Sequence, residues 1–168
     1  MAWALTSFYH TVINVRDLDE TIAFYKMLGF EVLNDRRTVV WPDFVATIFG
    51  LKQAKGRGVL MVLPSDPNGP MLDLLEWVEP RARFPDPARN ADEVPRILAF
   101  RTKNVEEAHG ELTAKGVKFT RDVFKPDIDL GIVGSCCCWD PNGNLIELIE
   151  LTPGVRHSKA NEALGAKA

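Results

Sequence analysis

The sequence predicts an α+β fold built from two tandem strand-helix-strand-strand-strand (βαβββ) modules. Two observations predict it. Signals for the start and the end of a helix occur twice, at an offset of 87 residues. The turn tetrapeptide Asp-Pro-Asn-Gly also occurs twice, at residues 66–69 and 140–143, each time before an apolar, strand-like run. Repeats of this length indicate a duplicated supersecondary unit.

Both expected helices have marked ends. Asp17 followed by Glu20 is a capping box with Asp in place of Ser or Thr, and Gly29 ends an apolar stripe at helical spacing. Asn104 and Gly116 repeat this start and stop.

Strand-like runs flank each helix, and the tetrapeptides are turn signals between the last two strands of each module. The expected strands are residues 8–15, 30–33, 59–63 and 71–76 in the first module, and residues 96–102, 117–121, 132–139 and 145–150 in the second.

The two repeat offsets differ, so the first module contains about 13 extra residues, which fall between residues 36 and 57. Their apolar side chains could form a short helix or lid against a pocket, or could cap the core. These side chains are Trp41, Phe44, Ile48 and Phe49.

The expected organisation is one domain followed by a tail. The domain spans residues 1–152, with module one at 7–80, a Pro-rich linker at 80–95 and module two at 95–152, and a polar tail spans 153–168.

Composition excludes several classes of partner. The net charge of −3 and a pI near 5.6 provide no basic field for nucleic acid or anionic lipid. Neither a leader nor an apolar run long enough to span a bilayer is present. The three cysteines are consecutive, which fits no disulfide framework. We therefore expect a cytoplasmic protein with no nucleic-acid partner and no membrane partner.

Three side chains could bind a metal. His10 lies in the first strand, where a histidine is either a hydrogen-bonded core residue or a ligand. Asp73 and Glu147 occupy equivalent places in the two modules, between apolar neighbours. A carboxylate buried in this way must be paired, protonated or bound to a cation.

The repeat partner of His10 is Ile97, so the two modules are not chemically symmetric. His10, Asp73 and Glu147 would supply one nitrogen and two carboxylate oxygens, with positions open for substrate or water. That donor set suits Mn²⁺, Fe²⁺, Ni²⁺ or Mg²⁺ at least as well as Zn²⁺. Arg101 shares a strand face with Ile97 and could bind a substrate carboxylate or phosphate, or balance a nearby acid.

The other polar candidates are expected to be structural. Glu76 and Glu150 face the opposite side from Asp73 and Glu147 and are interpreted as solvated strand positions. We expect small buried hydrophobes at Cys136, Cys137 and Cys138, and surface residues at His109 and His157.

Two stretches resemble the vicinal oxygen chelate superfamily, the glyoxalase/bleomycin-resistance/dioxygenase group. Residues 10–18, with 24–25 and 28–30, resemble its opening strand and helix, and residues 139–150 resemble its closing strand. With the repeat, the resemblance covers nearly all of residues 7–152. It implies a cup-shaped mixed sheet around one metal, with the helices outside.

Carried over by position, the family's ligands fall on His10, Asp73, Ile97 and Glu147. His10 and Glu147 match the pattern, Asp73 is a shorter substitute for the usual Glu, and Ile97 departs from it. Ring-cleaving dioxygenases need a second histidine that this chain does not place on a strand, so that activity is disfavoured.

Residues 72–77, 80–81 and 96–100 resemble the glyoxalase/methylmalonyl-CoA epimerase-like branch most closely. The resemblance implies a metal-dependent lyase, isomerase or epimerase acting on a small oxygenated substrate, and a homodimer. Glu147 would be a ligand that doubles as base, with Asp73 as the weaker alternative, and the pocket would be lined by Trp41, Phe44 and Trp77. The alternative is a metal-free, ligand-sequestering binding protein of the bleomycin-resistance type, and a third, less supported alternative is a metal-dependent dioxygenase.

Overall fold

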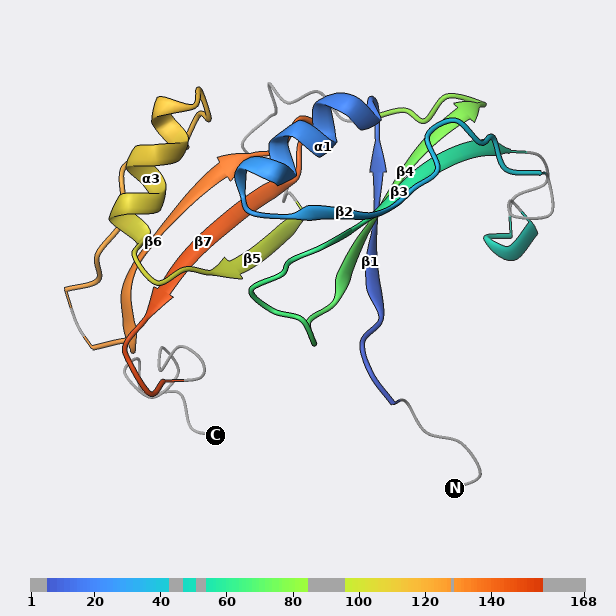
Figure 1. The fold of residues 1–168 in the computed structure, drawn as a ribbon. Coiled ribbons are helices and arrows are strands. Elements are labelled where there is room, and N and C mark those ends of the chain that lie inside the picture. Colours follow the sequence, from blue (N-terminus) through green and yellow to red (C-terminus); the bar gives the residue numbers. More distant parts are fainter. Residues whose placement is uncertain (1–5, 43–46, 51–53, 85–95, 128, 156–168) are drawn as a thin grey trace. The chain divides into compact units, whose positions relative to one another are not determined.

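The computed structural model describes residues 6–42, 47–50, 54–84, 96–127 and 129–155. The chain divides into two compact units, Met1–Pro87 and Ala88–Ala168, each described here by itself. The first unit contains β1 (His10–Val15), α1 (Leu18–Met27), β2 (Glu31–Asp35), β3 (Lys55–Val62) and β4 (Met71–Glu79), and the second contains β5 (Ile97–Arg101), α3 (Val105–Ala114), β6 (Ile132–Trp139) and β7 (Leu145–Leu151) (Figure 1).

The predicted helix ends are confirmed. Asp17 Oδ1 accepts a hydrogen bond of 2.9 Å from the backbone N–H of Glu20, at the start of α1. Asn104 repeats this cap at α3, where its Oδ1 accepts the N–H of Glu107 at 3.1 Å. Gly29 and Gly116 follow the helices with φ of 92° and 89°, a left-handed conformation that side chains with a Cβ rarely adopt.

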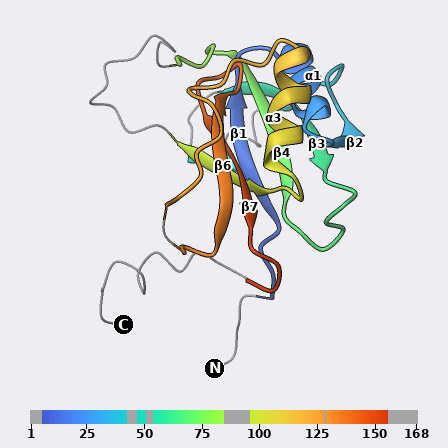
Figure 2. The same ribbon diagram turned by 90° about the vertical axis from the view of Figure 1, so that its left-hand side faces the viewer.

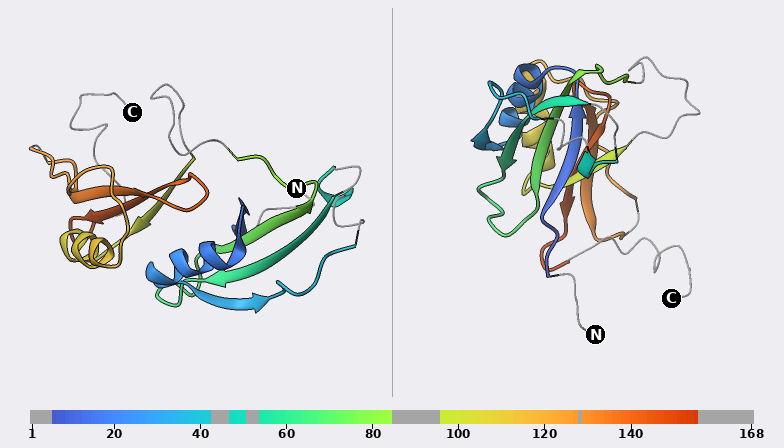
Figure 3. Two further views of the ribbon diagram at one scale, coloured as in Figure 1. Left: turned by 90° about the horizontal axis from the view of Figure 1, so that it is seen from above. Right: turned by 90° about the vertical axis from the view of Figure 1, so that its right-hand side faces the viewer.

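The sheet of the first unit has the strand order β1-β4-β3-β2, in which β1 runs parallel to β4 and the other pairs are antiparallel. Helix α1 packs against one face of this sheet (Figure 3, left). Side chains on that face, such as Leu74 and Met61, are buried. The opposite face is called here the site face of the first unit. It carries His10, Val12, Asn14, Asp73 and Trp77.

The sheet of the second unit has the order β5-β7-β6, with β5 parallel and β6 antiparallel to β7. Helix α3 packs against β6 and β7 (Figure 2). Ile146 and Cys138 lie opposite each other on that side of the sheet and are buried. The opposite face is called the site face of the second unit. It carries Ile97, Ala99, Arg101, Cys137 and Glu147.

One expected strand did not form as a strand. Residues 117–121 contribute an isolated bridge between Phe119 and Cys138, and a second bridge joins Phe124 to Ser135. The two bridges are five residues apart in the segment from Phe119 to Phe124 but only three apart on β6, from Cys138 to Ser135. The first segment therefore bends between the bridges, and the ladder is interrupted. Within the described residues, the α+β prediction is therefore confirmed with sheets of four and three strands.

The interpretation of Glu76 and Glu150 as solvated positions was wrong. The Glu76 side chain is 8 % exposed and forms a 3.0 Å ion pair with Arg57 from the neighbouring strand β3. Glu150 Oε2 accepts the backbone N–H of Val105 at 2.9 Å, at the first turn of α3. Both face the helix side of their sheets, where a carboxylate needs these partners because it is withdrawn from water.

The two remaining histidines have different outcomes. His109 lies on α3 and is half-buried, with its ring 4.3 Å from that of Phe119. It is therefore a packing residue rather than the expected surface residue. His157 lies outside the described residues.

Neither described helix has the length and apolar character required to cross a membrane.

Candidate functional site

The parallel ladder between β1 and β4 brings His10 and Asp73 to the same face. Val12 lies opposite Asp73, and His10 comes two residues before Val12 on the same side of β1. His10 Nδ1 and Asp73 Oδ1 are both buried and have no hydrogen-bond partner. Buried polar atoms are nearly always paired, and an imidazole nitrogen beside a carboxylate oxygen is a donor set that divalent cations accept. These two residues therefore fit two of the predicted ligand positions.

The electrostatics of Asp73 depend on burial. Burial raises the pKa of Asp73, and the charges of His10 and Arg36 oppose this increase without cancelling it. The carboxylate form is therefore costly at this position unless a cation stabilises it.

Sequence reasoning missed Arg36, which follows β2. Its guanidinium carbon lies 5.9 Å from the centre of the Trp41 ring, and its Nε is buried without a hydrogen-bond partner. The neighbouring Arg37 instead pairs with Asp19 and Asp35 on the surface. The sequence shows two adjacent arginines and does not distinguish them, because only the fold places Arg36 at Trp41 and Arg37 at the surface carboxylates.

Trp41 and Trp77 are brought together, as the predicted pocket requires. Their ring centres lie 6.4 Å apart in an edge-to-face arrangement. Phe49 packs edge-on against Trp77 at 6.0 Å, and Trp77 Nε1 donates a 2.9 Å hydrogen bond to Asn14 Oδ1. Phe44 lies outside the described residues, as do the other residues of 43–46 and residues 51–53 of the predicted helix or lid.

The third predicted ligand, Glu147, lies in the second unit. Its register partners are Ala99 on β5 and Cys137 on β6. Ile97 and Arg101 are exposed on either side of Ala99. Cys136 and Cys138 are buried, as predicted. The half-buried Cys137 was missed as a site-face residue, and burial, with a further contribution from the Glu147 charge, raises the pKa of its thiol.

The structure thus describes the predicted ligands as a pair in one unit and a single residue in the other. Among the residues in the described ranges, no three His, Cys, Asp or Glu side chains gather into a metal-binding group.

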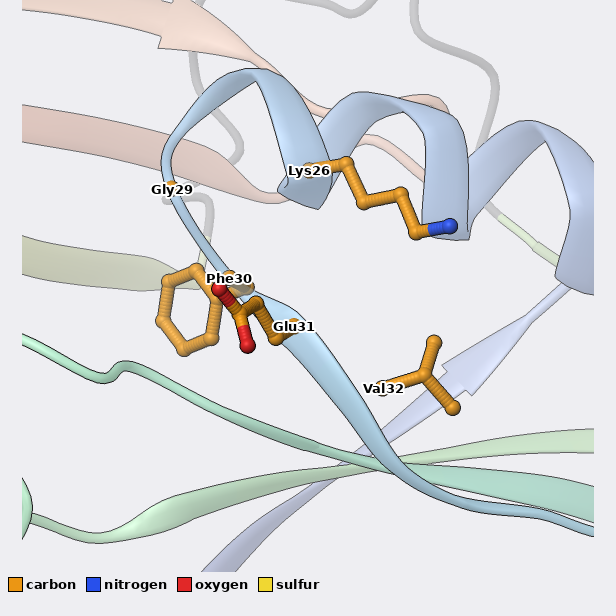
Figure 4. A pocket seen from close by; sticks show the side chains of 5 residues that line it. All are labelled: Lys26, Gly29, Phe30, Glu31 and Val32. Atoms are coloured by element: carbon orange, nitrogen blue, oxygen red, sulfur yellow. The ribbon is translucent and has the colours of Figure 1, made fainter.

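A pocket of about 410 Å³ opens where α1 ends and β2 begins (Figure 4). It contains none of the predicted site residues. Its lining is Lys26, Gly29, Phe30, Glu31 and Val32.

The solved structures that resemble the chain share its fold. A glyoxalase family protein from Bacillus cereus has a TM-score of 0.73 at 20 % identity, over 90 % of this chain and 99 % of that chain. The fosfomycin resistance protein FosX from Listeria monocytogenes has a TM-score of 0.55 at 20 % identity, over 89 % and 97 %. A V278E mutant of glyoxalase I from Zea mays has a TM-score of 0.57 at 18 % identity, over 87 % and 45 %.

No curated protein matched the chain. The family model described as Glyoxalase/Bleomycin resistance protein/Dioxygenase superfamily matches residues 7–148, which include both site faces. The chain therefore belongs to the glyoxalase/bleomycin resistance protein/dioxygenase superfamily.

Proposed function

We propose that the protein is a metal-dependent, glyoxalase-like lyase, isomerase or epimerase that acts on a small oxygenated substrate through an enolate or enediolate. The observation that supports this proposal best is the pair of buried, unpartnered atoms on the site face of the first unit, His10 Nδ1 and Asp73 Oδ1. Two such buried atoms are costly to leave unpaired, and a cation that binds both would remove this cost.

His10, Asp73 and Glu147 would hold the ion, which we propose to be Mn²⁺, Fe²⁺, Ni²⁺, Mg²⁺ or Zn²⁺. A bound divalent ion would supply Lewis-acid polarisation of a substrate carbonyl.

Within this proposal Glu147 takes the proton from the carbon next to the substrate carbonyl, and Asp73 is the weaker candidate for that role. Trp41, Phe44 and Trp77 would line the pocket, and Arg101 would contact a charged group of the substrate.

The decisive experiment is metal analysis of protein purified without an affinity tag. We expect a stoichiometric divalent metal in the wild type, and clear losses in His10→Ala and Glu147→Gln. His109→Ala is the matched control, since it removes a histidine that stacks on Phe119 and is expected to leave the metal content unchanged. Equal metal content in all four proteins would refute the proposed ligands.

Ile97 favours a second candidate function, a metal-free protein that sequesters a ligand. It lies 54 % exposed on the site face of the second unit and offers no donor atom where the family resemblance implies a ligand. Its test is thermal unfolding with an aromatic ligand. A stabilisation that grows with ligand concentration and ignores added chelator, in a protein that also contains no metal as purified, would support sequestration and count against the metal enzyme.

We also propose that the protein acts as a homodimer in the cytoplasm. The homodimer is predicted from the family resemblance, and the cytoplasmic location is predicted from the sequence.

A further inference from the structure

We propose that Arg36 binds the carboxylate of an aromatic acid whose ring lies against Trp41 and Trp77. This inference rests on the proposed function only in taking the site face of the first unit as the substrate side, and it names the class of substrate: an aromatic acid with a carboxylate, whose side chain also carries the enolisable carbonyl that the proposed function requires. No predicted site residue provides this contact.

The Arg36 side chain is half-buried. Its Nε is buried and lacks a hydrogen-bond partner. Two other arginines of this unit have carboxylates: Arg37 bonds to Asp35 and Asp19, and Arg57 bonds to Glu76. A buried guanidinium N–H without an acceptor is costly, and a carboxylate is the partner that matches its planar fork.

Asp73 does not supply this acceptor. Asp73 and Arg36 influence each other through their charges, but Asp73 Oδ1 has no hydrogen-bond partner and neither does Arg36 Nε. Arg36 therefore provides positive charge to this face and retains a free donor for a ligand.

An aromatic surface lies beside Arg36. The backbone N–H of Trp41 bonds to the carbonyl oxygen of Gly56 at 2.8 Å, which holds residue 41 alongside β3. The Trp41 ring lies across Gly56 and Gly58, so closely that a Cβ at these positions would be 3.2 and 2.8 Å from ring atoms. The ring is therefore seated where only glycine leaves room.

The two indole rings then form a corner. Trp77 lies at 85° to Trp41, and its Nε1 is fixed by Asn14, so its orientation is set by the sheet. Arg36 approaches the Trp41 ring at 5.9 Å. A cation beside one of two perpendicular rings suits a ligand with a flat apolar body and a negative end.

The test is binding of benzoate, with benzamide as the neutral ligand of the same shape, in the presence of chelator. Indole N–H signals of Trp41 and Trp77 report the binding by NMR. We expect benzoate to bind clearly more tightly than benzamide and to shift both signals. Arg36→Gln should weaken benzoate binding about tenfold or more and leave benzamide unchanged. Arg37→Gln is the matched control, since it removes the same charge one residue away, and should bind benzoate as the wild type does.

Equal affinities of the wild type for benzoate and benzamide would overturn the proposal, and so would unchanged benzoate binding by Arg36→Gln. Should Arg36→Gln not fold, Arg36→Lys replaces it, and a several-fold loss of benzoate affinity is expected because an ammonium lacks the planar fork. These measurements need no metal. Benzoate binding that depends on Arg36 in a protein with no metal would therefore support this inference while the proposed function failed.

Discussion

At the scale of single residues, the position of Trp41 depends on the absence of a side chain at Gly58. A Cβ on Gly58 would lie 2.8 Å from the Trp41 ring and 2.9 Å from the backbone oxygen of Leu74. Gly58→Ala should therefore displace Trp41 and lower the free energy of unfolding by about 1–3 kcal/mol, the usual cost of overpacking. Urea unfolding measures this loss.

The matched control is Gly110→Ala on α3, where an added Cβ meets nothing within 4 Å. This change should raise the free energy of unfolding by about 0.5–1 kcal/mol, because alanine favours a helix more than glycine does. A loss of stability at Gly110, or none at Gly58, would contradict the packing described here.

The surface pair of Asp35 and Arg37 predicts a dependence on pH. Hydrogen bonds from Arg37 lower the pKa of Asp35 from 3.8 to about 2. Since the folded value lies below the unfolded one, the pair stabilises the fold above pH 3.8 and loses this contribution as the pH falls through about 2. Asp35→Asn should destabilise the protein at pH 7, and the difference from the wild type should shrink on acidification below pH 3.8.

Chemical denaturation at several pH values measures that difference. Glu31→Gln on the same strand serves as the charge control, and no matching pH trend is expected from it. A destabilisation by Asp35→Asn that stayed constant down to pH 2 would show that the ion pair is not its source.

Sequence reasoning could place His10, Asp73 and Glu147, because strand alternation and the repeat assign each to a face. It could not find Arg36 or Cys137. The position of Arg36 depends on the path of the chain after β2. The position of Cys137 opposite Glu147 depends on the register between β6 and β7. Both are tertiary relations that no local pattern contains.

At the scale of elements, the N-cap of α3 should contribute measurably to stability. Asn104→Ala removes the acceptor for the Glu107 N–H and should lower the free energy of unfolding by about 1 kcal/mol. Asn104→Asp keeps an acceptor oxygen and should retain most of the stability. Thermal or urea unfolding compares the two, and equal losses in both variants would mean that the cap oxygen contributes nothing.

Helix ends were predictable because a cap is a local contact between residues three apart, and the two helices begin as expected. The absence of the strand expected at residues 117–121 was not predictable. It depends on the spacing between Phe119 and Phe124, which does not match the spacing between their partners Cys138 and Ser135. Spacing of this kind is set by two distant segments together.

At the scale of the whole molecule, we predict a homodimer. Each described sheet is open: β1 and β2 are the edge strands of one and β5 is an edge strand of the other, while Phe119 and Phe124 bridge to the outer side of β6. Exposed strand edges are usually covered in native proteins, and pairing with a second chain is one way to cover them. Light scattering should give twice the chain mass of 18.8 kDa. A monomer mass that persists at micromolar concentration would contradict the prediction.

The parallel ladders also have a consequence for the order of folding. His10 pairs with Met71, and Ile97 pairs with Leu145, so the first strand of each unit adds to its last strand. During synthesis, β1 has no partner until the whole of the first unit has left the ribosome, and closing so long a segment is entropically slow. The apolar residues Ile13 and Val15 stay exposed during that interval, which makes the first strand the segment of this unit most open to capture by chaperones.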